Sequence, residues 1–408
     1  MRDDTMLELR DVYKTFNPGT INEKIAMNGL SLKVKRGDFI TVIGGNGAGK
    51  STLMNAVTGV FSVDEGRIIL DGIDITRLPE YKRAKYFGRV FQDPMMGTAP
   101  NMQIEEKEPI RVLITGAHSY IGTSFEKWVS ENCPRIQTDT LDLKKTDWEK
   151  TDFSGYAVVF HVAGIAHADV SKVTEEQKQL YYQVNTELTA RCAEKAKTEG
   201  VKQFIFMSSM IVYGESASMK QPRMITRDTP LAPANFYGDS KVRAEEKLRK
   251  LDEDSFRVVI LRPPMIYGEG SKGNYPLLAK LAGKLPFFPA VKNERSMLYV
   301  GNLCKFISLL ICREERGIFF PQNREYVCTA SLVQQIAKEH GKKIALWKWL
   351  VPFVGLLEAM GGKPGGLVKK AFGNMTYEKS MSEYPEEYRV YDFAESVHLA
   401  EQCEKNGI

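Results

Sequence analysis

The sequence lacks several features that would assign it to a function class. Its six cysteines form no C-x-x-C pair and have no histidine at a metal-ligand interval, which argues against a zinc site and favours a reduced, cytoplasmic protein. Lysine and arginine are dispersed and the net charge is only +5, so we expect no nucleic acid partner. No apolar run follows the charged start MRDDTMLELR, which predicts no signal peptide.

Uninterrupted hydrophobic runs of membrane-spanning length are also missing. The most apolar segment, IALWKWLVPFVGLLEAM at 344–360, contains Lys348, Pro352 and Glu358 and falls short of the roughly 20 residues that a span needs. We expect a buried or substrate-lid helix there, with a membrane-surface role as the alternative. With 408 residues, of which 43% are hydrophobic and 26% charged, the chain can form two or three globular domains.

A first nucleotide-binding motif lies near residue 50. The segment GDFITVIGGNGAGKSTLMNAV predicts a strand at 39–43, a glycine-rich turn and a helix that opens at Lys50. In this G-x-x-x-x-G-K-S pattern, backbone amides without nearby Cβ atoms can surround phosphate oxygens, while Lys50 supplies a charge and Ser51 a hydroxyl for Mg²⁺. The pattern predicts a P-loop.

Residues 6 to about 106 resemble the first part of an ABC transporter ATPase subunit. Besides the P-loop, the resemblance is carried by LELRDVYKTF, EGRIILDGIDIT and VFQDP. It implies that Phe16 stacks on adenine, although a core or edge aromatic is the alternative, and that Gln92 and Ser51 contact Mg²⁺. The ATP-binding residues are then expected to be Phe16, Gly44, Asn46, Gly47, Gly49, Lys50, Ser51, Thr52 and Gln92.

The parts of such an ATPase that hydrolyse ATP do not follow. After Gln92 there is no LSGGQ-like signature, no Walker B acidic pair and no switch histidine. Because phosphoryl transfer depends on positioning and charge stabilisation, their loss removes nearly all catalysis. We therefore expect ATP binding with Mg²⁺ at most, no competent ATPase, and a truncated lobe whose sheet edges and apolar faces are uncovered.

A second nucleotide-binding pattern begins at residue 110. PIRVLITGAHSYIG predicts a strand at 110–114, a tight turn at Gly116 and a helix from Gly122, the order of a dinucleotide fingerprint in which Ser119 replaces the middle glycine. About 20 residues later, TDTLDLKK offers Asp139 and Asp142 to the adenosine end.

Two later segments contain the residues that we expect to carry out proton exchange. VKQFIFMSSMIVYG predicts a strand that ends at Ser208 and Ser209, where doubly wound sheets bind ligands. NFYGDSKVRAEEKL places Tyr237 and Lys241 four residues apart on one helix face. The ammonium, together with a positive nicotinamide ring, favours the phenolate of a tyrosine whose pKa is ordinarily near 10. We predict that Tyr237 exchanges a proton with a sugar hydroxyl and that Ser209 holds the same oxygen.

From about residue 109 onward, the chain resembles an extended short-chain dehydrogenase/reductase of the NAD-dependent epimerase/dehydratase type. YYQVNTELTARCAEKA, ILRPPMIYGEG and ERSMLYVGNL add to the motifs above. The resemblance implies NAD as the cofactor. NADP is the alternative, because Arg135 is expected to lie close to the adenosine end. The implied cofactor-binding residues are Gly116, Ser119, Tyr120, Ile121, Gly122, Asp142, Ala163, Gly164, Asn185, Lys241 and Pro263.

The same resemblance implies a nucleotide-sugar substrate. Arg295 is expected to meet its diphosphate, since a guanidinium grips phosphate bidentately, with Asn274 as a second substrate-binding residue. A surface ion pair is the alternative for Arg295. The motifs do not separate epimerase, reductase and dehydratase.

The expected fold is α/β, with a partial P-loop lobe at 1–106 followed by a Rossmann doubly wound parallel sheet at about 109–262 and a small substrate lobe within 263–408. The leading interpretation is a cytoplasmic, nucleotide-sugar epimerase or 4-keto reductase at 107–408. The alternatives are an ABC transporter ATP-binding protein at the membrane periphery, and a gene chimera without a joint function. A homodimer and a vestigial contact with a membrane permease stay open.

Overall fold

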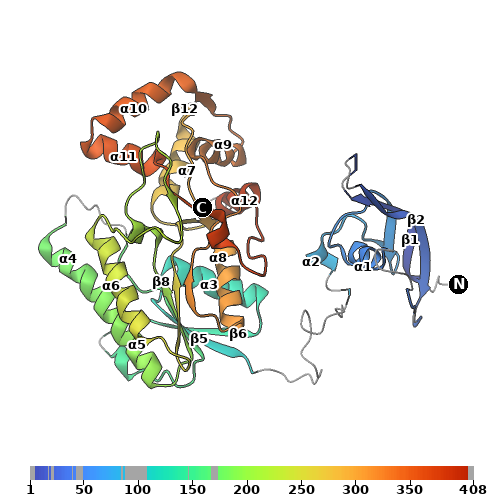
Figure 1. Ribbon diagram of the computed structural model, residues 1–408, viewed down its shortest axis with the longest axis horizontal. Helices are drawn as coiled ribbons and strands as arrows, with labels where there is room; N and C mark the ends of the chain where they lie inside the picture. Colours follow the sequence, from blue (N-terminus) through green and yellow to red (C-terminus); the bar gives the residue numbers. More distant parts are fainter. Residues whose placement is uncertain are drawn as a thin grey trace. The chain divides into compact units, whose positions relative to one another are not determined.

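The structure, a computed structural model, divides into two compact units. These units comprise residues 1–106 and 107–408 (Figure 1). The residues that it describes are 5–16, 18–19, 23–38, 40–42, 49–83, 86–87, 108–145, 147–166 and 173–402.

An antiparallel sheet forms the frame of the first unit. Its strands, in spatial order, are β2 (Lys24–Lys35), β1 (Thr5–Phe16), β3 (Glu65–Leu70) and β4 (Ile73–Asp74). Helices α1 (Lys50–Thr58) and α2 (Glu80–Arg83) accompany the sheet. In the described part of this unit, the buried core consists of Leu9, Val12, Met27, Ala56, Val57, Ile68, Leu70 and Ile75.

The strand predicted at 39–43 is wrong for the part of it that the structure describes. Ile40, Thr41 and Val42 belong to no strand, and Ile40 is exposed. A strand needs a neighbour for its backbone amides and carbonyls, and β3 and β4 pair with β1 and with each other instead. Met54 and Ile73 are exposed.

A six-stranded parallel sheet organises the second unit. In spatial order its strands are β14 (Gly317–Phe319), β10 (Arg257–Leu261), β8 (Gln203–Met207), β7 (Val158–His161), β5 (Ile110–Thr115) and β6 (Ile136–Leu141). The chain passes from β5 to β6 on one side and then to β7 on the other, so the strand order reverses at β5. Ligands of doubly wound sheets bind outside the carboxyl ends of the strands at such a reversal.

Helices cover both faces of this sheet. One layer contains α3 (Tyr120–Asn132) and α8 (Val300–Cys312); the other contains α4 (Glu175–Tyr182), the π-helical segment η4 (Gln183–Leu188), α5 (Thr189–Thr198) and α6 (Phe236–Leu251). In β10, Val259 and Leu261 belong to the core with α3 and α8, whereas Val258 and Ile260 belong to the core with α5 and α6. Side chains alternate across a strand, so a continuous apolar run buries both faces.

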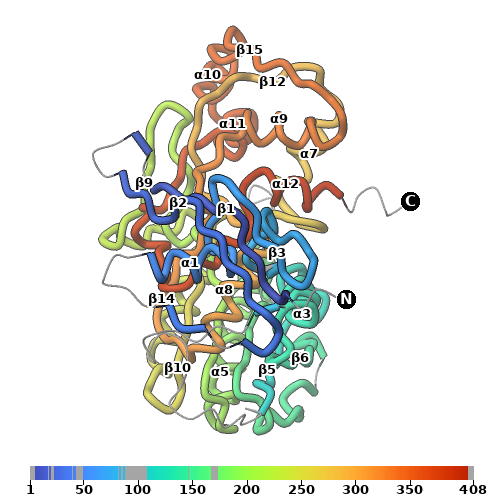
Figure 2. The backbone as a smooth tube through the Cα atoms, turned by 90° about the vertical axis from the view of Figure 1, so that its right-hand side faces the viewer, coloured from blue at the N-terminus to red at the C-terminus, as the bar shows by residue number. Residues whose placement is uncertain are grey.

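A smaller lobe is built mostly from residues beyond β10. Figure 2 shows α7, α9, α10, α11, β12 and β15 gathered at one end of the unit, away from β5, β6 and β10. Its elements, with the short segments that join it to the sheet, are η5 (Met210–Tyr213), β9 (Met224–Ile225), β11 (Met265–Tyr267), α7 (Asn274–Lys284), β12 (Phe287–Pro289), β13 (Met297–Tyr299), α9 (Thr329–Glu339), β15 (Ala345–Trp347), η6 (Lys348–Leu350), α10 (Val351–Ala359), α11 (Gly362–Phe372), β16 (Thr376–Tyr377), η7 (Lys379–Ser382) and α12 (Phe393–Gln402). The short helix η2 (Trp148–Lys150) belongs instead to the sheet, between β6 and β7, where Trp148 packs in the core.

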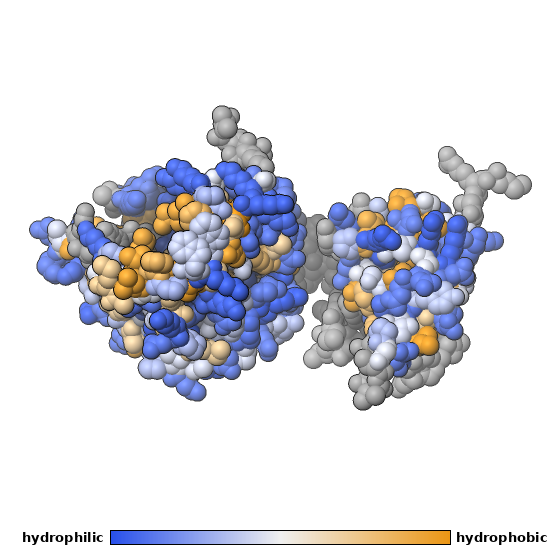
Figure 3. Space-filling view, turned by 90° about the horizontal axis from the view of Figure 1, so that it is seen from above, coloured by the Kyte–Doolittle hydropathy of each residue, from blue (hydrophilic) through white to orange (hydrophobic). Residues whose placement is uncertain are grey.

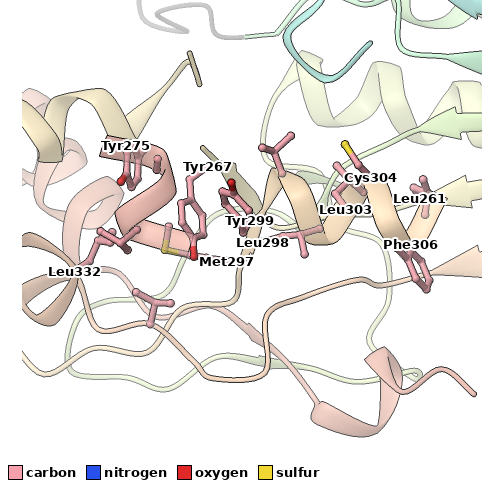
Figure 4. Packing of buried hydrophobic residues seen from close by; sticks show 14 of the residues in the cluster. Leu261, Tyr267, Tyr275, Met297, Leu298, Tyr299, Leu303, Cys304, Phe306 and Leu332 are labelled. Carbon is pink, nitrogen blue, oxygen red and sulfur yellow. The ribbon is translucent and has the colours of Figure 1, made fainter. Parts of the chain in front are cut away.

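One hydrophobic cluster joins the lobe to the sheet. It runs from Leu261 at the end of β10, through Tyr267 and Tyr299, to Leu332 of α9 (Figure 4). The buried Tyr267 hydroxyl lies 2.6 Å from the Ser396 Oγ. Because the cluster is continuous, the lobe is fixed against the carboxyl end of β10 by packing as well as by the chain itself.

Of the interpretations of the segment at 344–360, the buried helix is wrong, and the substrate-lid helix stays a prediction. Only Val354 is buried within α10, while Trp349, Leu356 and Met360 are 58%, 62% and 68% exposed. Periodicity gives no guidance here because α10 is apolar on all sides, so that no face is marked as the inner one. In the described part of the chain, the helices are too short or too polar to cross a membrane.

Candidate active site

Two turns that contain glycine meet where the strand order reverses. Gly116 follows β5 at φ 109°, a conformation that favours glycine, and a Cβ there would lie 2.7 Å from the backbone nitrogen of Ala163, just after β7. A Cβ on Gly164 would lie 3.1 Å from the Asn185 Oδ1 and 3.3 Å from the Lys241 Nζ. The two loops therefore pack closely through bare backbone, beside Asn185 and Lys241, at the strand reversal where doubly wound sheets bind dinucleotides.

The fingerprint turn leads into α3 through Ser119. Ser119 is the N-cap of α3, and its Oγ accepts a hydrogen bond from the Gly122 amide, 3.1 Å away. A Cβ on Gly122 would lie 3.1 Å from the Cγ2 of Ile114, so glycine permits close packing of helix and strand. Tyr120 and Ile121 form the first turn of α3. Serine at the middle fingerprint position thus stabilises the helix start by capping it.

The two acidic candidates occupy different places. Asp139 lies within β6 and accepts hydrogen bonds from Arg111 Nη2 and the Tyr156 hydroxyl, both at 3.0 Å. Asp142 directly follows β6, at the carboxyl edge of the sheet. Arg135 precedes β6, and a six-residue strand, about 20 Å long, separates it from that edge. The expectation that Arg135 lies near the adenosine end is therefore wrong.

Asn185 is buried inside the π-helical η4. Its Oδ1 accepts from the Ile165 amide at 2.8 Å, and its Nδ2 donates to the Ile165 carbonyl oxygen and the Ser240 Oγ, each at 3.1 Å. π-Helical turns are rare and often mark functional sites. Asn185 thereby ties the loop after Gly164 to helix α6.

Helix α6 brings Tyr237 and Lys241 to the carboxyl end of β8. The Lys241 Nζ donates to the carbonyl oxygen of Met207, the last residue of β8, at 2.9 Å, and it lies 4.6 Å from the centre of the Phe206 ring. The Tyr237 ring packs edge-on against Tyr181, with 6.2 Å between ring centres. Both candidate side chains are therefore held by contacts on the sheet and on neighbouring helices.

Burial moves the pKa values of these two residues in opposite directions. It raises the pKa of Tyr237 to about 12, an effect that Tyr181 reinforces and a hydrogen bond with Ser209 opposes. It lowers the pKa of Lys241 to about 8, against the attraction of Glu245. The protein's own groups therefore do not lower the pKa of the tyrosine as we expected, because desolvation of the phenolate outweighs the nearby ammonium.

Ser208 and Ser209 make different contacts at the end of β8. The Ser209 Oγ accepts from the Ile211 amide at 3.3 Å and hydrogen-bonds with Tyr237. Ser208 is buried and its Oγ donates to Glu245 Oε1 at 2.6 Å. Of the two serines, Ser209 is the one beside the tyrosine.

Sequence reasoning missed the buried ion pair behind these serines. Glu245 accepts from Arg262 Nε at 3.0 Å and from Nη2 at 2.5 Å, and Arg262 Nη1 donates to the Tyr213 hydroxyl at 2.7 Å. The one available signal was the position of Arg262, directly after a buried strand. Pro263 comes next, and its carbonyl oxygen accepts from the Met210 amide in the loop after β8.

Arg295 and Asn274 meet at the carboxyl end of α11. Arg295 Nη1 donates to the carbonyl oxygens of Lys370 and Ala371, at 2.5 and 3.5 Å, and Asn274 Nδ2 donates to that of Lys370 at 3.4 Å. Burial lowers the pKa of Arg295 to about 10, and none of the ion pairs among the described residues includes it. A largely buried guanidinium with carbonyl partners alone can still grip an anion.

The ATP-binding candidates are described only in part. Gly49 caps α1 at φ 84°, and a Cβ there would lie 2.7 Å from the Ala26 carbonyl oxygen. Residues 50–52 form the first turn of α1. Phe16 packs edge-on against Phe61, with 5.3 Å between ring centres. Four candidates lie outside the described residues, namely Gly44, Asn46, Gly47 and Gln92.

Comparison with known proteins relates the chain first to ABC transporters. The family model described as ABC transporter matches residues 27–180. A tyrosine transport ATP-binding protein of Clostridioides difficile (strain R20291) is 42% identical over 106 residues, which are 25% of this chain and 40% of that protein. The chain thus spans less than half the length of this relative.

Solved structures resemble the second unit in fold. A dTDP-4-dehydrorhamnose reductase from Clostridium acetobutylicum has a TM-score of 0.55 at 18% identity and covers 72% of this chain and 100% of its own. A UDP-glucuronic acid 4-epimerase from Bacillus cereus in complex with NAD has a TM-score of 0.55 at 16% identity, with 73% and 99% covered. These likenesses confirm the predicted α/β fold with a parallel sheet.

A second family relationship covers just over half of the chain. The model of the NAD dependent epimerase/dehydratase family matches residues 112–320. A UDP-glucose 4-epimerase of Vibrio cholerae is 34% identical over 254 residues, or 57% of this chain and 76% of that protein. An N-acetyl-alpha-D-glucosaminyl-diphospho-ditrans,octacis-undecaprenol 4-epimerase of Escherichia coli O157:H7 is 33% identical over 253 residues, or 57% and 73%. The chain therefore belongs to the NAD dependent epimerase/dehydratase family.

Proposed function

We propose that the second unit is an NAD(P)-dependent epimerase or 4-keto reductase of a sugar that is linked to a diphosphate. The observation that carries the proposal is the convergence of Ser209, Tyr237 and Lys241 at the carboxyl end of β8. A phenol that exchanges a proton, beside a hydroxyl that holds the same oxygen, is the set required for interconverting a sugar alcohol and a ketone.

Tyr237 carries the proton step in this proposal. As the phenolate, it takes the proton of the sugar hydroxyl when the alcohol is oxidised, and as the phenol it returns that proton when the ketone is reduced. Ser209 holds the same sugar oxygen, and Lys241 is fixed by its bond to Met207, where its charge favours the phenolate. When bound, the nicotinamide supplies hydride transfer at the carbon that bears this oxygen.

The loops at the strand reversal fit the cofactor. Gly116 lets the loop after β5 approach Ala163, and Gly164 lets the backbone approach Asn185 and Lys241, so bare backbone and polar groups gather there; Asp142 at the end of β6 fits a ribose hydroxyl. A carboxylate in this place favours NAD, since it would repel the 2′-phosphate of NADP. We assign cofactor binding to Gly116, Ser119, Tyr120, Ile121, Gly122, Asp142, Ala163, Gly164, Asn185, Lys241 and Pro263.

A diphosphate-linked sugar is supported by charge and by the relatives. The V. cholerae relative is named for UDP-glucose, and the E. coli relative for an N-acetylglucosaminyl-diphospho-undecaprenol. Both names contain a sugar diphosphate. In this chain, Arg295 forms no ion pair among the described residues and burial lowers its pKa to about 10, and Asn274 lies beside it. We propose that both bind the diphosphate, with a nucleotide as the leading carrier.

We infer a lesser role for the first unit. Lys50 and Ser51 support binding of ATP with Mg²⁺, but the sequence after Gln92 lacks the acidic pair, signature and switch histidine that hydrolysis needs. The ABC transporter match makes a vestigial contact with a membrane permease the second candidate. The described cysteines are free thiols, which supports the cytoplasm as the compartment.

The test is turnover by the purified full chain. UDP-glucose, UDP-N-acetylglucosamine and a UDP-4-keto sugar are each incubated with NAD(H) or NADP(H), and product identity and nicotinamide absorbance are followed. We expect activity that Tyr237→Phe abolishes and that Lys50→Ala leaves unchanged. Tyr384→Phe is the matched control, because its hydroxyl bonds with Glu315, away from the site. No turnover on any sugar, together with ATP hydrolysis that requires Lys50, would overturn the proposal.

A further inference from the structure

Helices α10 and α11 present an apolar surface that the proposed reaction does not use. Figure 3, which looks onto this end of the second unit, shows apolar side chains gathered within a hydrophilic border. The surface is here named the α10–α11 face, and its exposed residues are Trp349, Phe353, Leu356, Leu357, Met360 and Leu367. So many large apolar side chains in one place mark an interaction site.

Helix α10 is apolar on every side. Within VPFVGLLEA, Glu358 is the one charged residue and Val354 the one buried residue. A helix that is apolar all round is ordinarily buried in protein or lipid. With nine residues it is about 14 Å long, so it can lie in a bilayer surface but cannot cross a hydrocarbon core of about 30 Å.

The outward charges of this region are positive. Residues 342–373 contain six lysines and one carboxylate. That carboxylate, Glu358, turns inward and accepts from the Ser218 Oγ at 2.8 Å and the Met219 amide at 3.2 Å. Lys348 and Lys363 are exposed, and among the described residues they take part in no ion pair. The surface that remains combines apolar side chains with cations.

Trp349 is supported by a stack of aromatic rings. Phe287 and Trp347 stack with 4.0 Å between ring centres, Trp347 and Trp349 lie 5.5 Å apart, and Phe353 meets Trp349 edge-on at 5.9 Å. The stack holds the Trp349 ring at the surface. Tryptophan suits the boundary between lipid and water, because its ring is apolar and its N–H is polar.

We propose that the α10–α11 face docks the second unit on an anionic lipid bilayer. Helix α10 then lies in the plane of the interface, its apolar side chains enter the acyl boundary, and Lys348 and Lys363 contact the headgroups. Charge complementarity favours an anionic bilayer as the partner of this face. A second copy of the chain would instead bring the same lysines together on both sides of the contact.

Docking also has a consequence for the proposed substrate site. Helix α11 ends where the carbonyl oxygens of Lys370 and Ala371 accept from Arg295. The bilayer would therefore lie beside the helix that contacts the proposed phosphate-binding arginine. The docking itself stands on the exposed surface and its charge, and not on the proposed reaction.

The experiment is sedimentation of the full chain with vesicles. We expect binding to vesicles of 70% phosphatidylcholine and 30% phosphatidylglycerol, and roughly tenfold weaker binding to phosphatidylcholine alone or in high salt. Leu356→Gln/Met360→Gln should weaken binding by about tenfold or more, since it removes buried apolar area. The matched control is Leu180→Gln/Met224→Gln, which changes the same residue types at sites 46% and 52% exposed, and it should bind like the natural chain.

Tryptophan fluorescence reports which surface enters the lipid. Brominated phosphatidylcholine in the anionic vesicles should quench emission of the natural chain, and Trp349→Phe should lose more than half of that quenching. The other three tryptophans are buried or half-buried. Lys348→Glu/Lys363→Glu should abolish the preference for anionic vesicles while leaving the apolar contact in place.

Two results would overturn the proposal. If the Leu356→Gln/Met360→Gln variant bound vesicles as tightly as the natural chain, another surface would be responsible. If the natural chain formed a lipid-free dimer that this variant dissociated, the face would belong to a second copy. Vesicle binding is measured without sugar or cofactor, so failure of the proposed epimerase or reductase activity gives a separate result.

Discussion

The ammonium nitrogen of Lys241 lies 2.9 Å from the carbonyl oxygen of Met207. The contact joins α6 to the carboxyl end of β8 and fixes the charge one helical turn from Tyr237. With the pKa of Lys241 at about 8 and that of Tyr237 at about 12, the lysine is charged and the phenol protonated at neutral pH. The site is therefore poised to donate a proton, and must lose one before it can act as a base.

The first prediction follows from these two pKa values. The phenolate fraction grows with pH far below 12, so we expect the rate of sugar oxidation to rise from pH 6 to about 8. Above about 8 the lysine loses its charge and the rise should stop. Initial rates between pH 6 and 10 test this. Lys241→Arg, whose side chain stays charged, should show no break near pH 8 in its residual activity; a break there would assign the titration to another group.

Replacement of Lys241 by an apolar residue is predicted to increase the free energy of unfolding. Its folded pKa of about 8 lies below the ordinary value near 10.4, so the unfolded chain binds more protons between these values and stability rises with pH across that window. Lys241→Met removes the cost of the buried charge. We expect a free energy of unfolding about 1–3 kcal/mol higher at pH 7, with less gain at pH 10, in urea titrations.

Loss of stability of Lys241→Met at pH 7 would contradict this. It would show that the hydrogen bond to Met207 and the contact with the Phe206 ring outweigh desolvation of the ammonium. Lys247→Met, on the exposed side of the same helix and paired with Glu187, is the control and should leave the free energy of unfolding nearly unchanged.

Replacement of Glu245, which forms a buried pair with Arg262, is predicted to lower the free energy of unfolding. Glu245→Gln leaves the guanidinium without a charge partner inside the protein, which costs about 3–5 kcal/mol. It also weakens the acceptor of Ser208, beside the proposed catalytic serine. Thermal and urea unfolding measure the loss, and Glu187→Gln at the exposed pair is the control. A change as small as that of the control would show that solvent reaches Arg262 in the variant.

The predictable parts of the fold are those where a local pattern ends at a chemical motif. The strand before Gly116, the strand before Ser208 and the helix of Tyr237 and Lys241 all lie where their sequences place them. Apolar runs and the four-residue spacing are local properties, so contacts elsewhere do not alter them. The family comparisons then confirm the class of enzyme that these motifs indicate.

The remaining features depend on contacts that no local pattern contains. Residues 40–42 pair with none of the described strands and form no strand. The exposure of α10 depends on what the lobe leaves uncovered, and an all-apolar helix has no periodicity to reveal it. The pKa of Tyr237 depends on how deeply the whole site is buried. The pair of Glu245 and Arg262 joins a helix to the loop after a strand, which spacing alone cannot indicate.

Arg295 offers a prediction about substrate binding. Arg295→Lys keeps the positive charge but loses the planar fork that fits a diphosphate. We expect KM for a nucleotide sugar to rise by about 10- to 100-fold with kcat changed much less, since this residue is proposed to bind and not to react. Steady-state kinetics test the split, with Arg324→Lys at an exposed pair with Glu387 as the control. A fall in kcat alone would place Arg295 in the reaction instead.

The first unit should be the less stable part of the chain. Among its described residues, eight apolar side chains are buried in the core, and small cores give little stability. Limited proteolysis of the full chain should therefore leave a resistant fragment that begins near Lys107 and retains epimerase or reductase activity. If the P-loop binds ATP with Mg²⁺, saturating nucleotide should slow cleavage of the first unit, because a ligand at about 100 times its Kd stabilises by about 2.7 kcal/mol. Lys50→Ala should remove this protection. Equal resistance of both units without nucleotide would contradict this prediction. It would mean that contacts other than those of its small core protect the first unit from the protease.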